Sequence, residues 1–280
     1  MYIISICLYV RNNEDLINQW LQVFNDIEDS QAIELVIVDD GSTDRTLLNI
    51  QSFSLLYKGK IKLIMTPSVG YIAAINKAMA FMHGCFYCFV NIYDVLHKEY
   101  LINLPNLVNP SMQAYALYPV LEEERIITKQ TALCFLPNLS GYLFHKDVVS
   151  EIVDKSLEEN ILFDVLYQLM HHLEEIACLP YNYISIKKQP FPIDFSTFNY
   201  FKEVYVNDSE DRQTIIILMI HHLLIKGLHK KRNIKELYTL QKAIKEIEPR
   251  YLENRYLTMY AQKEMKDLTY LKKRLFFLIK

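Results

Sequence analysis

The sequence predicts an α/β protein with a mainly parallel central sheet, followed by a helical appendage at the C-terminal end. The first 95 residues alternate short β-rich runs with helical periodicity, which is typical of β-α-β units. Beyond Asp208 the pattern is almost entirely helical. With 280 residues, 51% of them hydrophobic and 22% charged, the chain is large enough to bury an extensive core.

Four strands joined by three helices are predicted for the N-terminal part. A helix capped by Asn12 or Asn13 places four apolar residues on one face, namely Ile17, Trp20, Leu21 and Phe24. Gly41 permits a sharp turn, and Ser42 or Thr43 can cap the second helix. Strands are expected at 2–10, 34–38, 60–65 and 86–90, and the third helix at 70–81.

Residues 101–185 show a mixed pattern. The expected strands are 114–120, 126–135 and 176–184, and the expected helices are 147–157 and 161–173. Pro190 and Pro192 mark a domain boundary, so we predict one domain over 1–190 and a helical region over 191–280.

Charge divides the chain unevenly. Residues 1–225 carry 15 basic against 27 acidic side chains, a net −12, whereas 226–280 carry 15 against 6, a net +9. The acidic body and the lack of a recognition motif argue against nucleic-acid binding. Five cysteines in apolar runs, no secretory signal and no apolar run of spanning length together predict a cytoplasmic protein that is not integral to a membrane.

Three polar clusters follow the predicted strands or precede a helix, at 39–44, 67–70 and 91–94. Ligands of open parallel sheets bind outside the carboxyl ends of the strands, so these clusters should converge on one cleft. Carboxylates there can accept hydrogen bonds from a base or ribose, and helix N-termini attract a diphosphate. The pattern therefore predicts a site of nucleotide size.

The residues in these clusters resemble the family 2 glycosyltransferases, which have the Rossmann-like GT-A fold. Residues 34–46, Glu-Leu-Val-Ile-Val-Asp-Asp-Gly-Ser-Thr-Asp-Arg-Thr, are similar to that family's nucleotide-binding segment. Gly70, Ala74 and Asn76 match its G-x-x-x-A-x-N helix. More loosely, 140–144 resembles its acceptor-side loop and Phe163-Asp164 its catalytic-base segment, so the resemblance covers about residues 1–190.

The resemblance implies a role for each matching residue. Asp39 or Asp40 would bind the base of a sugar nucleotide, a UDP-sugar above all, with Ser42 and Asp44 shaping that loop. Gly70 and Asn76 would lie at the nucleotide, joined by Asn91. Asp164 would be the general base that takes the proton of the acceptor hydroxyl, with inversion at the anomeric carbon.

One departure from the family bears on metal use. Asn91-Ile92-Tyr93 stands where the family has an Asp-x-Asp metal motif, a degenerate form that leaves Asp94 as the candidate ligand for Mg²⁺ or Mn²⁺. Without a cation, another group must neutralise the leaving diphosphate, and Arg125, Lys187 and Lys188 are candidates. Two interpretations stay open: a working transferase, and a catalytically silent GT-A domain that binds nucleotide or forms complexes.

The implied function is transfer of a sugar from a nucleotide donor to a glycan, lipid-linked or protein acceptor in bacterial surface polysaccharide or glycoconjugate synthesis. Residues 268–280 combine a basic cluster with five apolar residues, which suits peripheral contact with the inner face of the cell membrane, a docked helix or a homodimer contact. Simpler roles stay open for Ser42 and Asp44 as turn and cap, Asp94 as a turn residue, and Asp164 as an exposed helix residue.

Overall fold

The computed structural model describes residues 3–25, 27, 32–119, 125–129, 131–132, 138–153, 162–185, 242 and 245. The chain divides into two compact units, Met1–Lys129 with Asn138–Phe191, and Gln130–Pro137 with Pro192–Lys280. Nearly all of the predicted helical region 191–280, including the tail 268–280, lies outside the described residues. The predicted boundary at residue 190 therefore stays a prediction.

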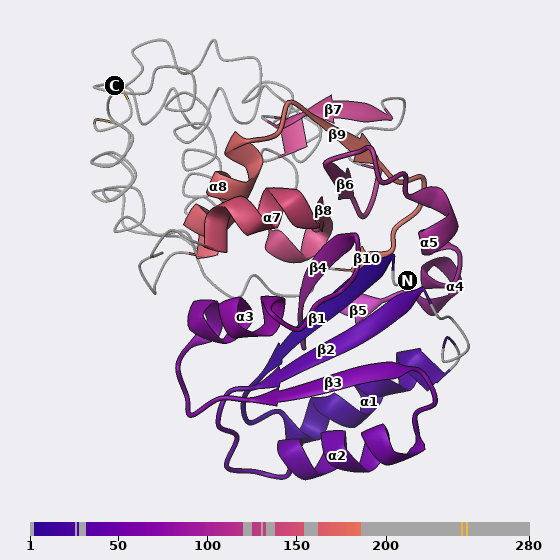
Figure 1. Ribbon diagram of the computed structural model, residues 1–280, viewed down its shortest axis with the longest axis vertical. Coiled ribbons are helices and arrows are strands. Elements are labelled where there is room, and N and C mark those ends of the chain that lie inside the picture. The colour runs from indigo at the N-terminus through magenta and orange to yellow at the C-terminus, as the bar shows by residue number, and fades with distance from the viewer. Residues whose placement is uncertain are drawn as a thin grey trace, which may run out of the picture. The chain divides into compact units, whose positions relative to one another are not determined.

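The first unit is built on an eight-stranded sheet in the order β3-β2-β1-β4-β8-β6-β9-β7 (Figure 1). Strands β1 to β4 are mutually parallel, and β8 runs antiparallel between β4 and β6. Strand β9 is parallel to β6, and β7 is antiparallel to β9. A second sheet pairs β5 with β10. The elements are β1 Ile4–Val10, α1 Glu14–Asn25, β2 Ile33–Asp39, α2 Thr46–Leu56, β3 Lys60–Met65, α3 Tyr71–Met79, β4 Phe86–Asn91, β5 Val95–Leu96, α4 Lys98–Leu101, α5 Leu104–Leu107, β6 Ala114–Ala116, β7 Ile126–Thr128, the 3₁₀ turn η1 Leu139–Gly141, β8 Tyr142–His145, α7 Lys146–Val153, α8 Leu162–His171, β9 Glu175–Cys178 and β10 Ile184–Ser185. This arrangement confirms the predicted mainly parallel α/β body.

The core between helix α1 and the sheet follows from sequence periodicity. The four predicted apolar residues of α1 are its buried ones, and they join a cluster with alternate residues of β1. That alternate set is Ile4, Ile6, Leu8 and Val10. Strand β2 is buried at all seven positions, as expected for a parallel strand covered on both faces. The strand–helix pattern of the first 91 residues is thus confirmed.

Residues 101–185 differ from prediction at strands whose local sequence pattern is weak. Residues 140–144 were expected to form a loop, but Tyr142–His145 is the buried strand β8, paired with β4 and β6. The expected strand 176–184 is two strands in different sheets, β9 and β10, separated by a segment that includes Pro180, which lacks the N–H a ladder needs. Helices α7 and α8 agree with prediction within their described bounds.

No helix within the described part of the chain is both long and apolar enough to cross a membrane.

Candidate functional site

Asp40 is the most heavily bonded side chain at the carboxyl edge of the sheet. It is fully buried, and its Oδ1 accepts hydrogen bonds from Thr66 Oγ1 at 2.6 Å and the Val69 N–H at 2.7 Å. Its Oδ2 accepts from the Gly70 N–H at 2.9 Å and the Tyr9 hydroxyl at 3.0 Å. Burial alone raises the pKa of Asp40, but these four donors outweigh it and hold that pKa below its ordinary value. Asp40 is therefore an ionised clamp that fixes loop 66–70 against β1 and β2.

The clamp changes what the N-terminus of α3 can offer. Helix N-termini bind anions through their free N–H groups. Here the Gly70 N–H, expected to face a diphosphate, donates to Asp40. The carboxylate of Asp40 already accepts this N–H, so the hydrogen-bond pattern gives no support to the predicted contact between Gly70 and the nucleotide.

Asp39 differs from its neighbour although it is also buried. Among the described side chains, the Ser42 hydroxyl donates a hydrogen bond to Asp39, at Oδ1. The backbone oxygen of Asp39 accepts from the Thr66 N–H at 2.9 Å. Of the two carboxylates, Asp39 is the one that retains acceptor capacity for a ligand.

Ser42 and Asp44 join the loop after β2 to the turn after β1. Ser42 Oγ accepts from the Asn12 N–H at 3.0 Å. Asp44 accepts from the Glu14 N–H at 3.1 Å and from the Thr46 N–H at 2.9 Å, at the starts of α1 and α2. Despite the opposing effect of burial, these bonds lower the pKa of Asp44. Neither Ser42 nor Thr43 caps the second helix as expected: the N-cap residue of α2 is Arg45, which makes no side-chain cap hydrogen bond, and Asp44 accepts from the N–H of Thr46, the first residue of the helix.

The segment that contains Asp94, the predicted metal ligand, is a hydrogen-bonded turn. The Asn91 N–H donates to Asp94 Oδ2 at 3.1 Å, and the Asp94 N–H donates to the Asn91 carbonyl at 2.9 Å. Asn91 Oδ1 accepts from the Tyr93 N–H at 3.1 Å. Asp94 is buried, and within the described residues no three His, Cys, Asp or Glu side chains are grouped to hold a metal. This donor set does not fit Mg²⁺ or Mn²⁺, which favour several charged oxygen ligands.

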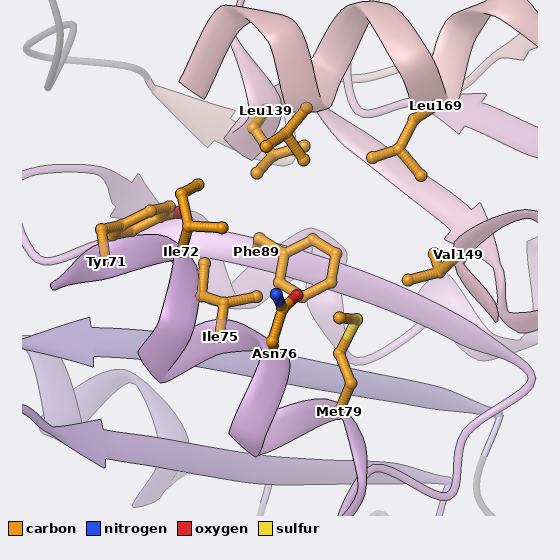
Figure 2. A pocket seen from close by; sticks show the side chains of 10 residues that line it. Tyr71, Ile72, Ile75, Asn76, Met79, Phe89, Leu139, Val149 and Leu169 are labelled. Carbon is orange, nitrogen blue, oxygen red and sulfur yellow. The ribbon is translucent and has the colours of Figure 1, made fainter. Parts of the chain in front are cut away.

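Asn76 lies apart from the carboxylates. Its amide points into a pocket among Met79, Phe89 and Leu169, between α3, β4 and α8 (Figure 2). Six residues of helix separate it from Gly70, a rise of about 9 Å. The structure therefore groups Asp39, Asp40, Ser42, Gly70 and the Asn91–Asp94 turn at one edge, but not Asn76.

The other candidates are farther away or undescribed. The side chain of Asp164 lies outside what the structure describes, although its position belongs to α8, whose Val165 lines the same pocket. Arg125 is exposed beside β7, four strand positions beyond β4, or on the order of 19 Å at usual strand spacing. Lys187 and Lys188 lie outside the described residues.

Sequence reasoning missed the contribution of two tyrosines. Tyr9 donates to Asp40, and its ring contacts that of Tyr71 edge to face, with 5.0 Å between the ring centroids. Burial, reinforced by Asp40, raises the pKa of Tyr9. Strand order places Tyr9 near Asp40, because both lie at the carboxyl ends of adjacent parallel strands, but their contact depends on the register of those strands.

Comparison with known proteins agrees with this architecture. Residues 5–109 match the family model described as glycosyl transferase family 2. No curated protein sequence matches the chain. Among solved structures, S. aureus TarS 1–349 in complex with UDP-GlcNAc is 16% identical, with a TM-score of 0.66 over 88% of this chain and 80% of that one.

Two further structures are similar. TarS 1–349 in complex with UDP is 15% identical, with a TM-score of 0.64 over 95% of this chain and 93% of that one. The mannosyltransferase PcManGT from Pyrobaculum calidifontis, in complex with GDP-Man and Mn²⁺, is 13% identical, with a TM-score of 0.50 over 94% and 86%. At these identities the likeness shows the fold. The chain therefore has the GT-A fold, and its residues 5–109 are similar to the family 2 glycosyltransferases.

Proposed function

We propose that the protein transfers a sugar from a UDP-linked donor to a glycan, lipid-linked or protein acceptor, with inversion at the anomeric carbon. The observation that carries this proposal is the state of Asp39, a buried carboxylate at the carboxyl end of β2 with capacity for another donor. Uracil presents a ring N–H that such an oxygen can accept. The TarS complexes with UDP-GlcNAc and UDP, on a similar fold, support the choice of nucleotide.

Each group has a defined part in the proposed reaction. Asp39 binds the base, while Asp40 keeps the adjoining loop 66–70 in place. Asp164 removes the proton from the acceptor hydroxyl as its oxygen bonds to the anomeric carbon. The bond from that carbon to the diphosphate breaks, and the electron pair leaves with the nucleoside diphosphate. Because the Asn91–Asp94 turn does not fit a cation, donor binding should not need Mg²⁺ or Mn²⁺.

Donor binding is tested by the rise in melting temperature with UDP, UDP-GlcNAc or GDP-mannose. UDP compounds should stabilise the protein, and Asp39→Asn should abolish most of that shift because it removes an acceptor. Asp15→Asn, an exposed change in α1, is the matched control. A wild-type protein that responds to no nucleotide, or an Asp39→Asn variant that responds fully, would contradict the proposal.

Catalysis is tested separately by release of UDP in the presence of glycan and lipid-linked acceptors. Asp164→Asn should lower turnover by about 100-fold or more while leaving the nucleotide-induced shift unchanged. Binding of UDP-sugars without transfer to any acceptor would favour the silent-domain interpretation.

A further inference from the structure

We propose that Arg11 binds the diphosphate of the sugar-nucleotide donor and supplies the positive charge that this group requires. Arg11 directly follows β1, at the carboxyl edge of the sheet. The inference rests on the proposed function, because it assigns a residue to the donor site described there. It goes beyond that function by naming the side chain that meets the negative charge of the donor.

The described donor site holds negative rather than positive charge. The Asn91–Asp94 turn does not fit Mg²⁺ or Mn²⁺, because its polar groups bond within the turn. The Val69 and Gly70 N–H groups before α3 donate to Asp40. Asp39 and Asp40 are buried acidic side chains. The diphosphate of a bound donor therefore needs a cationic side chain beside it.

Two cationic side chains belong to the loops that follow the four parallel strands. Those loops are residues 11–13, 40–45, 66–70 and 92–94. All of them are described, and the Lys and Arg residues that they contain are Arg11 and Arg45. Arg45 precedes α2, and its N–H donates to the Glu14 carboxylate, at the start of α1, at 2.8 Å. A carboxylate thus already lies beside Arg45.

Strand order places Arg11 between the two ends of the donor. Strand β1 lies between β2 and β4 (Figure 1). Val10, the last residue of β1, is in register with Asp39 at the end of β2. Asp164, the proposed general base, belongs to α8, which lines the pocket beside β4. A donor with its base at β2 and its sugar toward β4 must pass its diphosphate across the end of β1, about 5 Å from each neighbouring strand.

The Tyr9 hydroxyl shows where the charge of Arg11 acts. Burial raises the pKa of Tyr9, and the bond to Asp40 raises it further. The positive charge of Arg11 lowers that pKa, and the negative charge of Asp39 raises it. The Arg11 guanidinium and both carboxylates therefore act on one hydroxyl at the end of β1.

Arg11 is exposed, and it forms no ion pair with another residue of the described part of the chain. A guanidinium presents paired N–H donors that match two oxygens of a phosphate. A purely structural role would be to offset the charges of Asp39 and Asp40. Exposed charges without a close partner contribute little to stability, so such a role would leave nucleotide binding unaffected.

The test is calorimetric titration of the full chain with uridine and with UDP, in the presence of EDTA. Wild type should bind UDP about tenfold or more tightly than uridine. Arg11→Gln should weaken UDP binding by about tenfold and leave uridine binding unchanged. Arg11→Lys should keep part of the difference, because it keeps the charge but not the paired donors. Lys60→Gln, which removes one exposed positive charge at the start of β3, is the matched control.

The melting temperatures of these variants should stay near that of wild type, because both sites are exposed. Unchanged UDP binding by Arg11→Gln, an equal loss of uridine binding, or an equal loss in Lys60→Gln would overturn the inference. A loss in Arg45→Gln instead of Arg11→Gln would overturn it in favour of Arg45.

The same titrations separate this inference from the proposed function. A wild-type protein that binds uridine, but binds UDP no more tightly in EDTA, would overturn the role of Arg11 and leave base binding at Asp39 intact. A wild-type protein that binds neither compound would contradict the proposed function, and the inference with it.

Discussion

The adjacent carboxylates of Asp39 and Asp40 differ in how many donors they accept. Asp40 receives four hydrogen bonds, two of them from the backbone at Val69 and Gly70. Asp39 receives one from a described side chain, that of Ser42. A charged buried acceptor is strongly stabilised by fixed donors, and removing it leaves those donors unsatisfied. Asp40 should therefore matter for stability and Asp39 for ligand binding.

Asp40→Asn should lower the free energy of unfolding by on the order of 2–3 kcal/mol at neutral pH. Both carboxyl oxygens accept a backbone N–H, so an amide must turn its NH₂ group toward one of these donors. Urea unfolding measures the loss, and Asp15→Asn should change little. A variant as stable as wild type would show that the clamp contributes no stability.

The lowered pKa of Asp40 also predicts how the difference in unfolding free energy between wild type and Asp40→Asn changes with pH. The donors hold the pKa of folded Asp40 below the ordinary value of 3.8, so its contribution is present above that value and is lost as pH falls through the lower folded pKa. The gap in stability between wild type and Asp40→Asn should therefore shrink below about pH 3.8. Urea titrations across the acid range would show this, and a gap that widens with acid would contradict it.

At the scale of elements, the loop after β2 depends on the conformation of Gly41. Its φ is +72°, and a Cβ there would lie 3.0 Å from the Ser68 backbone nitrogen. Gly70 has φ +90°, and a Cβ added to it would meet no atom within 4 Å. Gly41→Ala should therefore cost strain plus a shift of loop 66–70, and Gly70→Ala strain alone, which is about 1–3 kcal/mol. Thermal unfolding should rank Gly41→Ala below Gly70→Ala, and the reverse order would show that the contact with Ser68 is unimportant.

The Asn91–Asp94 turn bears on metal dependence. Since Asn91 and Asp94 bond within the turn, chelation of divalent ions with EDTA should leave the UDP-induced shift in melting temperature unchanged. Added Mn²⁺ should not increase it. If EDTA abolishes the shift, a cation takes part in donor binding and the turn must rearrange to hold it.

The elements that sequence predicted well are those whose signals are local. Strands β1, β2 and β4 are apolar runs, β3 begins with alternating basic and apolar residues, and α1 has an unambiguous apolar face. Strand β8 was missed because its four residues become a strand only by pairing with β4 and β6. The order of the strands along the chain predicted which edge of the sheet holds the site. It did not predict the donors to Asp40, because Thr66 and Tyr9 are 26 and 31 residues away along the chain and their contact with Asp40 depends on strand register.

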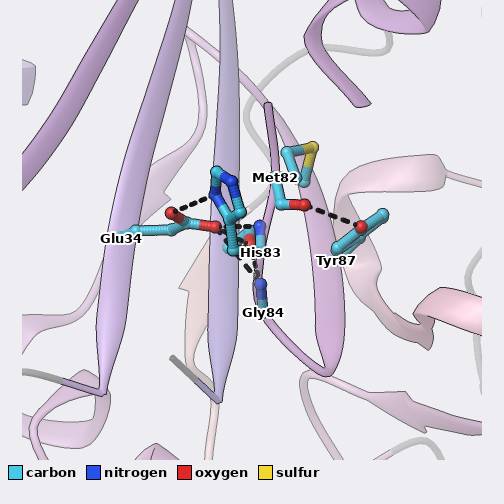
Figure 3. A network of polar contacts seen from close by, with 6 residues as sticks. Glu34, Met82, His83, Gly84 and Tyr87 are labelled. Carbon is cyan, nitrogen blue, oxygen red and sulfur yellow. Dashed lines mark hydrogen bonds and ion pairs between the residues drawn. The ribbon is translucent and has the colours of Figure 1, made fainter. Parts of the chain in front are cut away.

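At the scale of the whole sheet, a second buried carboxyl group acts at the opposite edge. Glu34 is 2% exposed and accepts from the Ser5 hydroxyl, the His83 N–H and, at 3.2 Å, the Gly84 N–H (Figure 3). His83 Nδ1 lies 3.3 Å from its other oxygen. Glu34 thus joins β1, β2 and the connection from α3 to β4, as Asp40 joins β1, β2 and the connection from β3 to α3. Polar contacts thus join β1 and β2 at both edges, and at the Glu34 edge they also hold the segment that precedes β4.

The two clamps should respond differently to loss of charge. At Glu34, the donors Ser5, His83 N–H and Gly84 N–H all meet one oxygen, and the other faces His83 Nδ1, which accepts when that ring nitrogen is unprotonated. Glu34→Gln can therefore keep every hydrogen bond, whereas Asp40→Asn cannot. We expect Glu34→Gln to lose less than about 1 kcal/mol of unfolding free energy. Glu34→Leu should lose on the order of 3 kcal/mol, because it leaves the Ser5 hydroxyl and the His83 N–H without their acceptor, whereas the Gly84 N–H keeps its 2.8 Å bond to Ser5 Oγ. Urea unfolding of Glu34→Gln, Glu34→Leu and Asp40→Asn at one pH decides between these outcomes. If Glu34→Gln is as damaging as Glu34→Leu, the charge of Glu34, and not the placement of its acceptor atoms, holds this edge together.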